Sequence, residues 1–134
     1  MALRPDARAT ALAYIDALNT HDPEAIAALV AVDFVNEHTS ALGTSLVGRD
    51  AYKARLPSFL GAFDGLQYEV EDVIVDGDRA GVPYTLTADC RGSDGVLRPV
   101  AIRGMFRFRI SDGLIAHRVD YWDSKSYESQ VEGH

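Results

Sequence analysis

The stretch GLIAHRVDYWD, residues 113–123 near the C-terminus, decides how the chain is expected to fold. It follows a tight turn at residues 111–113, and its alternation predicts a strand. One face of this strand carries Ala116, Arg118, Asp120 and Trp122. The other face carries Ile115, His117, Val119 and Tyr121. If the first face points inward, it places an ionisable acid in an apolar interior, where enzymes obtain acids and bases with shifted pKa values.

The composition indicates one acidic globular domain. The chain has 134 residues, 47% of them hydrophobic, which suffices for one core. We therefore expect a single domain over residues 1–134, with a polar tail at 124–134 that is frayed or forms a short terminal extension. The net charge of −7, with no cluster among the 13 basic residues, argues against a nucleic-acid partner.

The sequence also predicts a soluble protein of the cytoplasm. No apolar run reaches the length of a membrane span, and the N-terminus has no apolar run of the signal-peptide kind. The single Cys90 excludes an internal disulfide. No spacing of histidines and carboxylates fits a metal site, so we predict no metal.

The N-terminal half alternates helices with one short strand. Apolar residues at helical spacing predict three helices, over residues 5–19, 23–31 and 50–63. Asp22 fits the N-cap of the second helix, and Pro57 predicts a kink or break in the third. The short strand is DFVNEHTS, residues 33–40, and a loop follows over 41–47. One face of this strand carries Phe34, Asn36 and His38.

The C-terminal half reads as four long strands joined by turns, over residues 66–75, 79–90, 96–110 and 113–123. The alternation is lost near Asp72, which suggests a bulge, and Pro83 implies an edge or an irregular ladder. The third strand alternates most clearly, with Phe106 and Phe108 inward and with Arg103, Met105, Arg107 and Arg109 outward.

This order of elements predicts an α+β fold. We expect a cone-shaped, curved, mixed or antiparallel sheet with three helices packed on its concave face and a cavity between the two layers. The outward face, with Met105 and its alternating arginines, predicts a homodimer packed sheet to sheet.

The order, together with the motifs DFVNEHTS, GRDAY, FRFRISDGLI and HRVDYWD, resembles the SnoaL-like polyketide cyclase branch of the nuclear transport factor 2-like superfamily. The resemblance covers nearly the whole chain and extends to ketosteroid isomerases and limonene-type epoxide hydrolases. Its motifs are specific for the fold, whereas the reaction stays open because the superfamily includes isomerases, hydrolases, cyclases and non-catalytic proteins.

The resemblance to ketosteroid isomerases implies several site residues. Tyr14 matches the helix tyrosine that donates a hydrogen bond to the substrate oxyanion. The proton-shuttling aspartate falls on His38, or on Glu37 if the strand slips by one residue. The second oxyanion donor falls close to Gly104, which leaves that role vacant, and Trp122 matches an aromatic residue of the same pocket.

The other relatives point to the C-terminal strand. Asp120 matches the water-activating aspartate of limonene-type epoxide hydrolases, and Asn36 matches their water-holding asparagine. Their middle-strand arginine and aspartate fall near Tyr84 and Leu86, neither of which is charged, so the epoxide-opening acid is missing. The polyketide cyclases of the family use an aspartate near this strand as acid and base, a role that Asp120 can take.

Two functions from different classes are consistent with these residues. The first is a cofactor-independent enzyme that moves protons on a small hydrophobic carbonyl or polyketide-like substrate. In it, Asp120 and His38 exchange the proton, Tyr14 or Asn36 holds the oxygen, and the substrate also contacts Phe34, Phe106, Arg118 and Trp122.

The second function is a non-catalytic pocket protein or accessory domain, in which the same polar groups only orient a hydrophobic ligand. For Asp120 there is also a purely structural alternative, an ion pair with Arg118.

Overall fold

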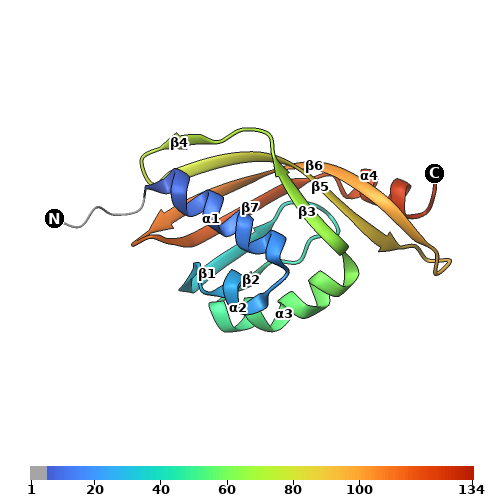
Figure 1. The fold of residues 1–134 in the computed structure, drawn as a ribbon, viewed down its shortest axis with the longest axis horizontal. Helices are drawn as coiled ribbons and strands as arrows, with labels where there is room; N and C mark the ends of the chain where they lie inside the picture. The colour runs from blue at the N-terminus through green and yellow to red at the C-terminus, as the bar shows by residue number, and fades with distance from the viewer. Residues whose placement is uncertain (1–5) are drawn as a thin grey trace.

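A strongly curved mixed sheet forms the body of the structure, a computed structural model that describes residues 6–134 (Figure 1). Its strands are β1 (Val30–His38), β2 (Leu46–Val47), β3 (Asp64–Val70), β4 (Ile74–Asp76), β5 (Arg79–Arg91), β6 (Leu97–Ser111) and β7 (Leu114–Trp122). They lie in the order β2-β1-β7-β6-β5-β3, with β4 also paired to β5. The pair of β1 and β7 is parallel, and the other pairs are antiparallel. The predicted α+β fold of the nuclear transport factor 2-like kind is confirmed.

Three of the helices lie together on one side of the sheet (Figure 1). The helices are α1 (Ala7–Thr20), α2 (Pro23–Ala27), α3 (Arg49–Ala62) and α4 (Ser124–Val131). Asp6 and Asp22 cap α1 and α2, because each carboxylate accepts a hydrogen bond from a free backbone N–H of the first turn. Pro5, which was expected in the first turn of the first helix, lies outside the described residues.

Four expectations about the elements need correction. The third helix does not break at Pro57, because this residue is exposed and the carbonyl group left without a donor can face water. The second helix ends early, since Val30 already pairs with Ile115 of β7. The strand expected over 66–75 divides into β3 and β4 opposite Pro83, which has no N–H to donate there. Leu46 and Val47 pair with β1 instead of lying in a loop.

The segment expected as a frayed tail is the helix α4, which packs on β6. Asp123 caps it by accepting from the N–H groups of Lys125 and Ser126. The Gln130 side chain forms hydrogen bonds with both backbone groups of Ala101 on β6, and Val131 is buried. A polar composition therefore concealed an amphipathic helix whose polar groups bind the edge of a strand.

The two faces of the sheet follow the predicted alternation along β6. Val100, Ile102, Phe106, Phe108 and Ile110 are buried, whereas Arg103, Arg107 and Arg109 are exposed. Ile115 departs from the expected outward position, because a register shift between Arg109 and Ile110 turns it into the core. The homodimer through the outer face stays a prediction. Within residues 6–134, no helix is long and apolar enough to cross a membrane.

Candidate active site

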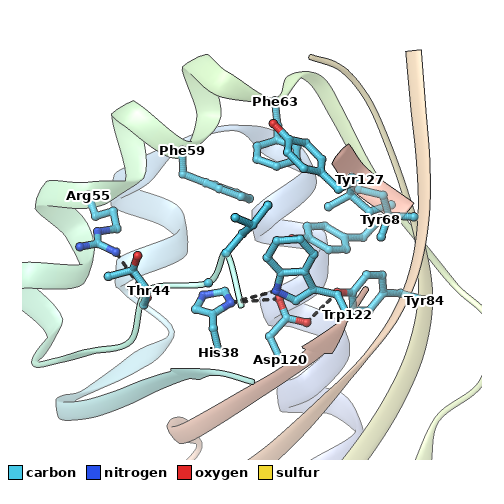
Figure 2. Close-up of a pocket in the computed structure, with 14 residues that line it drawn as sticks. His38, Thr44, Arg55, Phe59, Phe63, Tyr68, Tyr84, Asp120, Trp122 and Tyr127 are labelled. Carbon is cyan, nitrogen blue, oxygen red and sulfur yellow. Dashed lines mark hydrogen bonds and ion pairs between the residues drawn. The ribbon is translucent and has the colours of Figure 1, made fainter. Parts of the chain in front are cut away.

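The parallel pairing of β1 and β7 places the polar residues of the two strands side by side. Asn36 pairs with Arg118, and His38 pairs with Asp120. All four side chains lie on the inner face, as the sequence predicted. Nδ1 of His38 is 3.7 Å from Oδ2 of Asp120 (Figure 2). His38 is therefore the residue that stands beside Asp120.

Asp120 is a nearly buried acid, 5% exposed, at the wall of a pocket. Its Oδ1 accepts a hydrogen bond of 2.6 Å from the Tyr84 hydroxyl. Within residues 6–134, no donor forms a hydrogen bond with its Oδ2. Burial raises the pKa of Asp120, while the charge of Arg118 and the hydrogen bond from Tyr84 act in the opposite direction. One carboxylate oxygen is thus fixed and the other is free to exchange a proton.

Tyr84 reaches Asp120 by crossing over Gly104. In the sheet register, Gly104 lies between Tyr84 of β5 and Trp122 of β7. A Cβ atom at position 104 would lie only 2.3 Å from the Tyr84 hydroxyl oxygen. The Tyr84 hydroxyl therefore occupies the space that a side chain at position 104 would take, but it donates its proton to Asp120, so the oxyanion-donor role that the resemblance left vacant there is not filled by it. Sequence reasoning missed this contact, which only the register across three strands could have revealed.

Arg118 is a buried cation whose hydrogen-bond partners are neutral. Its guanidinium donates to Oδ1 of Asn36 at 2.8 Å and to the Tyr14 hydroxyl at 3.1 Å, and it lies 3.3 Å from Nε2 of His38. It also lies over the Phe106 ring, 5.0 Å from its centroid. Among the described residues, no carboxylate lies within 4.0 Å of it, so the alternative of a direct Arg118–Asp120 ion pair is wrong.

His38 faces a hydrogen-bond donor at each ring nitrogen. Arg118 lies at Nε2, and the indole Nε1 of Trp122 lies 3.3 Å from Nδ1. A neutral imidazole accepts at only one nitrogen, and the charged guanidinium is the stronger donor. We therefore assign the proton to Nδ1, on the side of Asp120, which leaves the Trp122 N–H, although it is directed at Nδ1, without a lone pair to bind there.

The charge state of His38 follows from the same surroundings. Burial, and next the positive charges of Arg118 and Arg55, lower its pKa to about 4. The imidazole is therefore uncharged at neutral pH. It can orient Asp120 or pass a proton on, but it does not hold a positive charge.

This lowered pKa predicts that His38 makes the protein less stable in mild acid. The unfolded chain binds the proton near pH 6.5, whereas the folded chain binds it only near pH 4, so the contribution of His38 to stability is lost as the pH falls through this window. We expect a loss of at most about 2 kcal/mol after screening by solvent. Denaturant unfolding between pH 7 and 4 should show this slope in the wild type and a smaller one in His38→Gln. Equal slopes in both proteins would contradict the assignment.

A pocket of about 280 Å³ opens next to these groups (Figure 2). Most of its lining is apolar, and it consists of His38, Leu42, Gly43, Thr44, Arg55, Phe59, Phe63, Tyr68, Tyr84, Leu86, Ile102, Asp120, Trp122 and Tyr127. A smaller inner chamber of about 60 Å³ shares five of these residues and adds Asn36, Tyr52, Leu56 and Arg118. The loop after β1 packs on His38 because position 43 is glycine: a Cβ there would lie 2.3 Å from that of His38.

The structure brings five of the eight predicted site residues to the pocket or its chamber. They are Asn36, His38, Arg118, Asp120 and Trp122. Tyr14, Phe34 and Phe106 line neither space. Tyr14 and Phe34 contact Tyr52, and Phe106 packs against the rings of Tyr68 and Tyr84. The Tyr14 hydroxyl is hydrogen-bonded to that of Tyr52, which lines the inner chamber, so Tyr14 lies behind the residues that a ligand would contact.

Sequence reasoning missed the aromatic residues of the wall, namely Tyr52, Phe59, Phe63, Tyr68, Tyr84 and Tyr127. The spacing of Tyr52, Phe59 and Phe63 along α3 marked the buried side of a helix and gave no sign that part of this side borders a cavity. Within residues 6–134, no three His, Cys, Asp or Glu side chains gather as a metal site would require.

Several solved structures share this fold over nearly the whole chain. A candidate SnoaL-like polyketide cyclase from Shewanella denitrificans has 19% identity and a TM-score of 0.85, covering 96% of this chain and 98% of its own. A protein with a ketosteroid isomerase-like fold from Catenulispora acidiphila, in complex with trimethylamine, has 18% identity and a TM-score of 0.81, covering 91% of each chain. A candidate ketosteroid isomerase from Kribbella flavida has 27% identity and a TM-score of 0.71, covering 90% of this chain and 82% of its own.

A comparison with curated proteins finds no significant match. The profile of the SnoaL-like domain family, however, matches residues 11–118, which run from α1 into β7. The expected resemblance is therefore confirmed, and the chain belongs to the SnoaL-like domain family.

Proposed function

We propose that this chain is a cofactor-independent enzyme that moves a proton at a carbon next to a carbonyl group in a small, mostly apolar, polyketide-like molecule. One observation carries the proposal. Asp120 lies at an apolar pocket wall with Oδ1 held by Tyr84 and with Oδ2 free of hydrogen bonds from residues 6–134. Such a carboxylate is oriented and poorly solvated, as a general base must be.

The proton transfer uses both protonation states of Asp120. Oδ2 takes the proton from the substrate carbon, and the electron pair of that C–H bond moves into the carbonyl group to form an enolate. The raised pKa of Asp120 favours this step, because a base works best when its pKa approaches the working pH. The resulting carboxylic acid then returns the proton to the same carbon, which completes an exchange, or to another carbon, which isomerises the substrate. In a ring closure, the enolate carbon instead attacks a second carbonyl carbon of the substrate, and the acid gives its proton to the alkoxide oxygen formed there.

The enolate oxygen needs a hydrogen-bond donor beside Asp120. Two side chains at this end offer donors: the indole of Trp122, whose N–H the tautomer of His38 leaves without an acceptor, and the guanidinium of Arg118 at the inner chamber. These groups take the role that the sequence suggested for Tyr14 or Asn36. Tyr14 becomes a positioning residue, because it holds Arg118 and Tyr52 from behind.

A proton-exchange assay tests the proposal without knowledge of the natural substrate. A panel of cyclic ketones, aryl ketones and 1,3-diketones is incubated with the protein in D₂O, and loss of the α-proton signals is followed by NMR. We expect at least one bound ketone to exchange faster than in buffer by about 10²-fold or more. Binding of panel members without any gain in exchange would contradict an enzymatic role.

That second outcome would support a pocket that binds a hydrophobic ligand without catalysis. One observation favours this alternative: His38 is uncharged at neutral pH and faces Arg118 and Trp122, so it is suited to orienting a ligand. Titration of the protein with the panel members that bind would then measure their affinity, and the protein would act as a carrier or accessory domain.

A further inference from the structure

Helix α3 carries three cations, and they differ in how they are engaged. Arg49 donates from Nε and Nη2 to the Val30 carbonyl, at 3.0 and 2.7 Å, and Lys53 pairs with Glu24. Arg55 has one long hydrogen bond, 3.4 Å, to the Thr44 carbonyl. Within residues 6–134, no carboxylate lies within 4.0 Å of its guanidinium.

Of the three cations of α3, Arg55 is the one that lines the pocket. Its side chain lines both the pocket and the inner chamber, on the side of the pocket away from Tyr84 (Figure 2). Arg55, Thr44 and Leu42 are exposed, so they form the rim. Its positive charge contributes to the lowered pKa of His38, after burial and the charge of Arg118.

The rest of the lining offers nothing to neutralise this charge when Asp120 is protonated. His38 is then uncharged, and the remaining members are apolar, aromatic or small. The six aromatic rings among them are Phe59, Phe63, Tyr68, Tyr84, Trp122 and Tyr127. Such walls suit a flat, conjugated body, and a guanidinium at the rim suits a carboxylate, which it can bind through two parallel hydrogen bonds.

We propose that the ligand of this pocket is a flat aromatic keto acid whose carboxylate binds Arg55 at the rim while its carbonyl end reaches Asp120. The inference rests on the proposed function for the orientation of the carbonyl group, whereas the carboxylate contact depends only on the pocket. Arg118 is a poorer partner for the carboxylate, because the chamber beside it is small and three of its nitrogen atoms already have protein partners.

Two matched probes test the contact. The probes are 4-oxo-4-phenylbutanoic acid, an aryl ketone with a carboxylate, and its neutral amide. Their affinities are measured by calorimetry and by the fluorescence of Trp122, which is the chain's one tryptophan and lines the pocket. We expect the acid to bind on the order of tenfold more tightly than the amide, with a preference that falls as salt is added, because the rim is exposed.

Two variants test whether Arg55 is the residue that binds the carboxylate. Arg55→Gln should lower the affinity for the acid to that for the amide and leave the amide unchanged. Arg8→Gln is the matched control, since Arg8 is also exposed and also has one 3.4 Å hydrogen bond to a backbone carbonyl, that of Val73, away from the pocket. It should keep the full preference for the acid.

Other outcomes overturn the inference. Equal affinities of the wild type for both probes, an acid preference that survives Arg55→Gln, or no binding of the acid at millimolar concentration would each do so. None of these results decides the proposed proton transfer, because the exchange assay tests Asp120 with neutral ketones, which have no carboxylate for Arg55 to bind. If the wild type shows no preference for the acid but still accelerates exchange, only the keto acid ligand is excluded. If the wild type prefers the acid but does not accelerate exchange, only the enzymatic role is excluded.

Discussion

Asp120→Asn is expected to lower the rate of substrate proton exchange by about 10²–10⁴-fold, the usual contribution of a general base. Asparagine keeps the size of the side chain, and its Oδ1 can still accept from the Tyr84 hydroxyl. It has no carboxylate oxygen at the free position, so no atom can take the proton. The affinity for a neutral ketone should stay within about threefold, as measured by the same titration.

The same substitution should not destabilise the fold at neutral pH. The pKa of Asp120 is raised in the folded state, so ionisation of this carboxyl costs stability as the pH rises above the ordinary value of 3.8. Asparagine removes this cost, and the advantage of the variant in thermal unfolding should shrink as the pH is lowered. Asp33→Asn, a change at an exposed acid on β1, should alter neither exchange nor stability. Undiminished exchange by Asp120→Asn would exclude its role as the base.

Gly104→Ala is expected to have the largest effect on stability among single substitutions near the site, about 3 kcal/mol. The added Cβ would lie 2.3 Å from the Tyr84 hydroxyl oxygen and 2.8 Å from the Tyr121 carbonyl oxygen. The Tyr84 ring must move, which breaks its hydrogen bond to Asp120. Denaturant unfolding measures the loss, and the exchange assay should show a parallel loss of activity.

Two further variants separate crowding from a general intolerance of alanine. Gly61→Ala in α3 meets nothing within 4 Å and should stabilise the protein by up to about 1 kcal/mol. Adding Tyr84→Ala to Gly104→Ala should cost less than the sum of the two single changes, because the smaller side chain leaves room for the new methyl group. Additive costs would show that the contact between positions 84 and 104 is not the cause.

The sequence was most informative where one strand carried its own pattern. The alternation in GLIAHRVDYWD placed Arg118, Asp120 and Trp122 on one face, which the family resemblance then implied to be the inner one, and that of β6 placed Phe106 and Phe108 in the core. Alternation depends only on neighbouring residues of one strand, so it can be read without knowledge of the partners.

The contacts between distant strands could not be read in the same way. The pairing of His38 with Asp120 needs the parallel register of β1 and β7, which no local turn fixes. Tyr84 needs the register across β5, β6 and β7 together. Tyr14 was expected at the site from the family resemblance, yet whether a buried hydroxyl borders a cavity or lies behind another ring depends on the packing of α3.

The helix α4 shows how composition misleads at a chain end. Its residues are mostly polar, but Tyr127 and Val131 are four residues apart and so share one side of a helix. Tyr127 lies against Trp122 and lines the pocket, and Val131 is buried. Two apolar residues were too weak a pattern to outweigh their six polar neighbours in the helix.

The parallel pairing of β1 with β7 also has a consequence that we expect for the order of events during folding. Asn36 and Arg118 are 82 positions apart in the chain, so their contact closes more than half of the polypeptide into one loop. Hairpins such as that of β5 and β6 close much shorter loops and can form first. Ligand binding is consequently a property of the finished molecule alone: a chain still under synthesis, or one cut before β7, has neither Asp120 nor the wall that holds it.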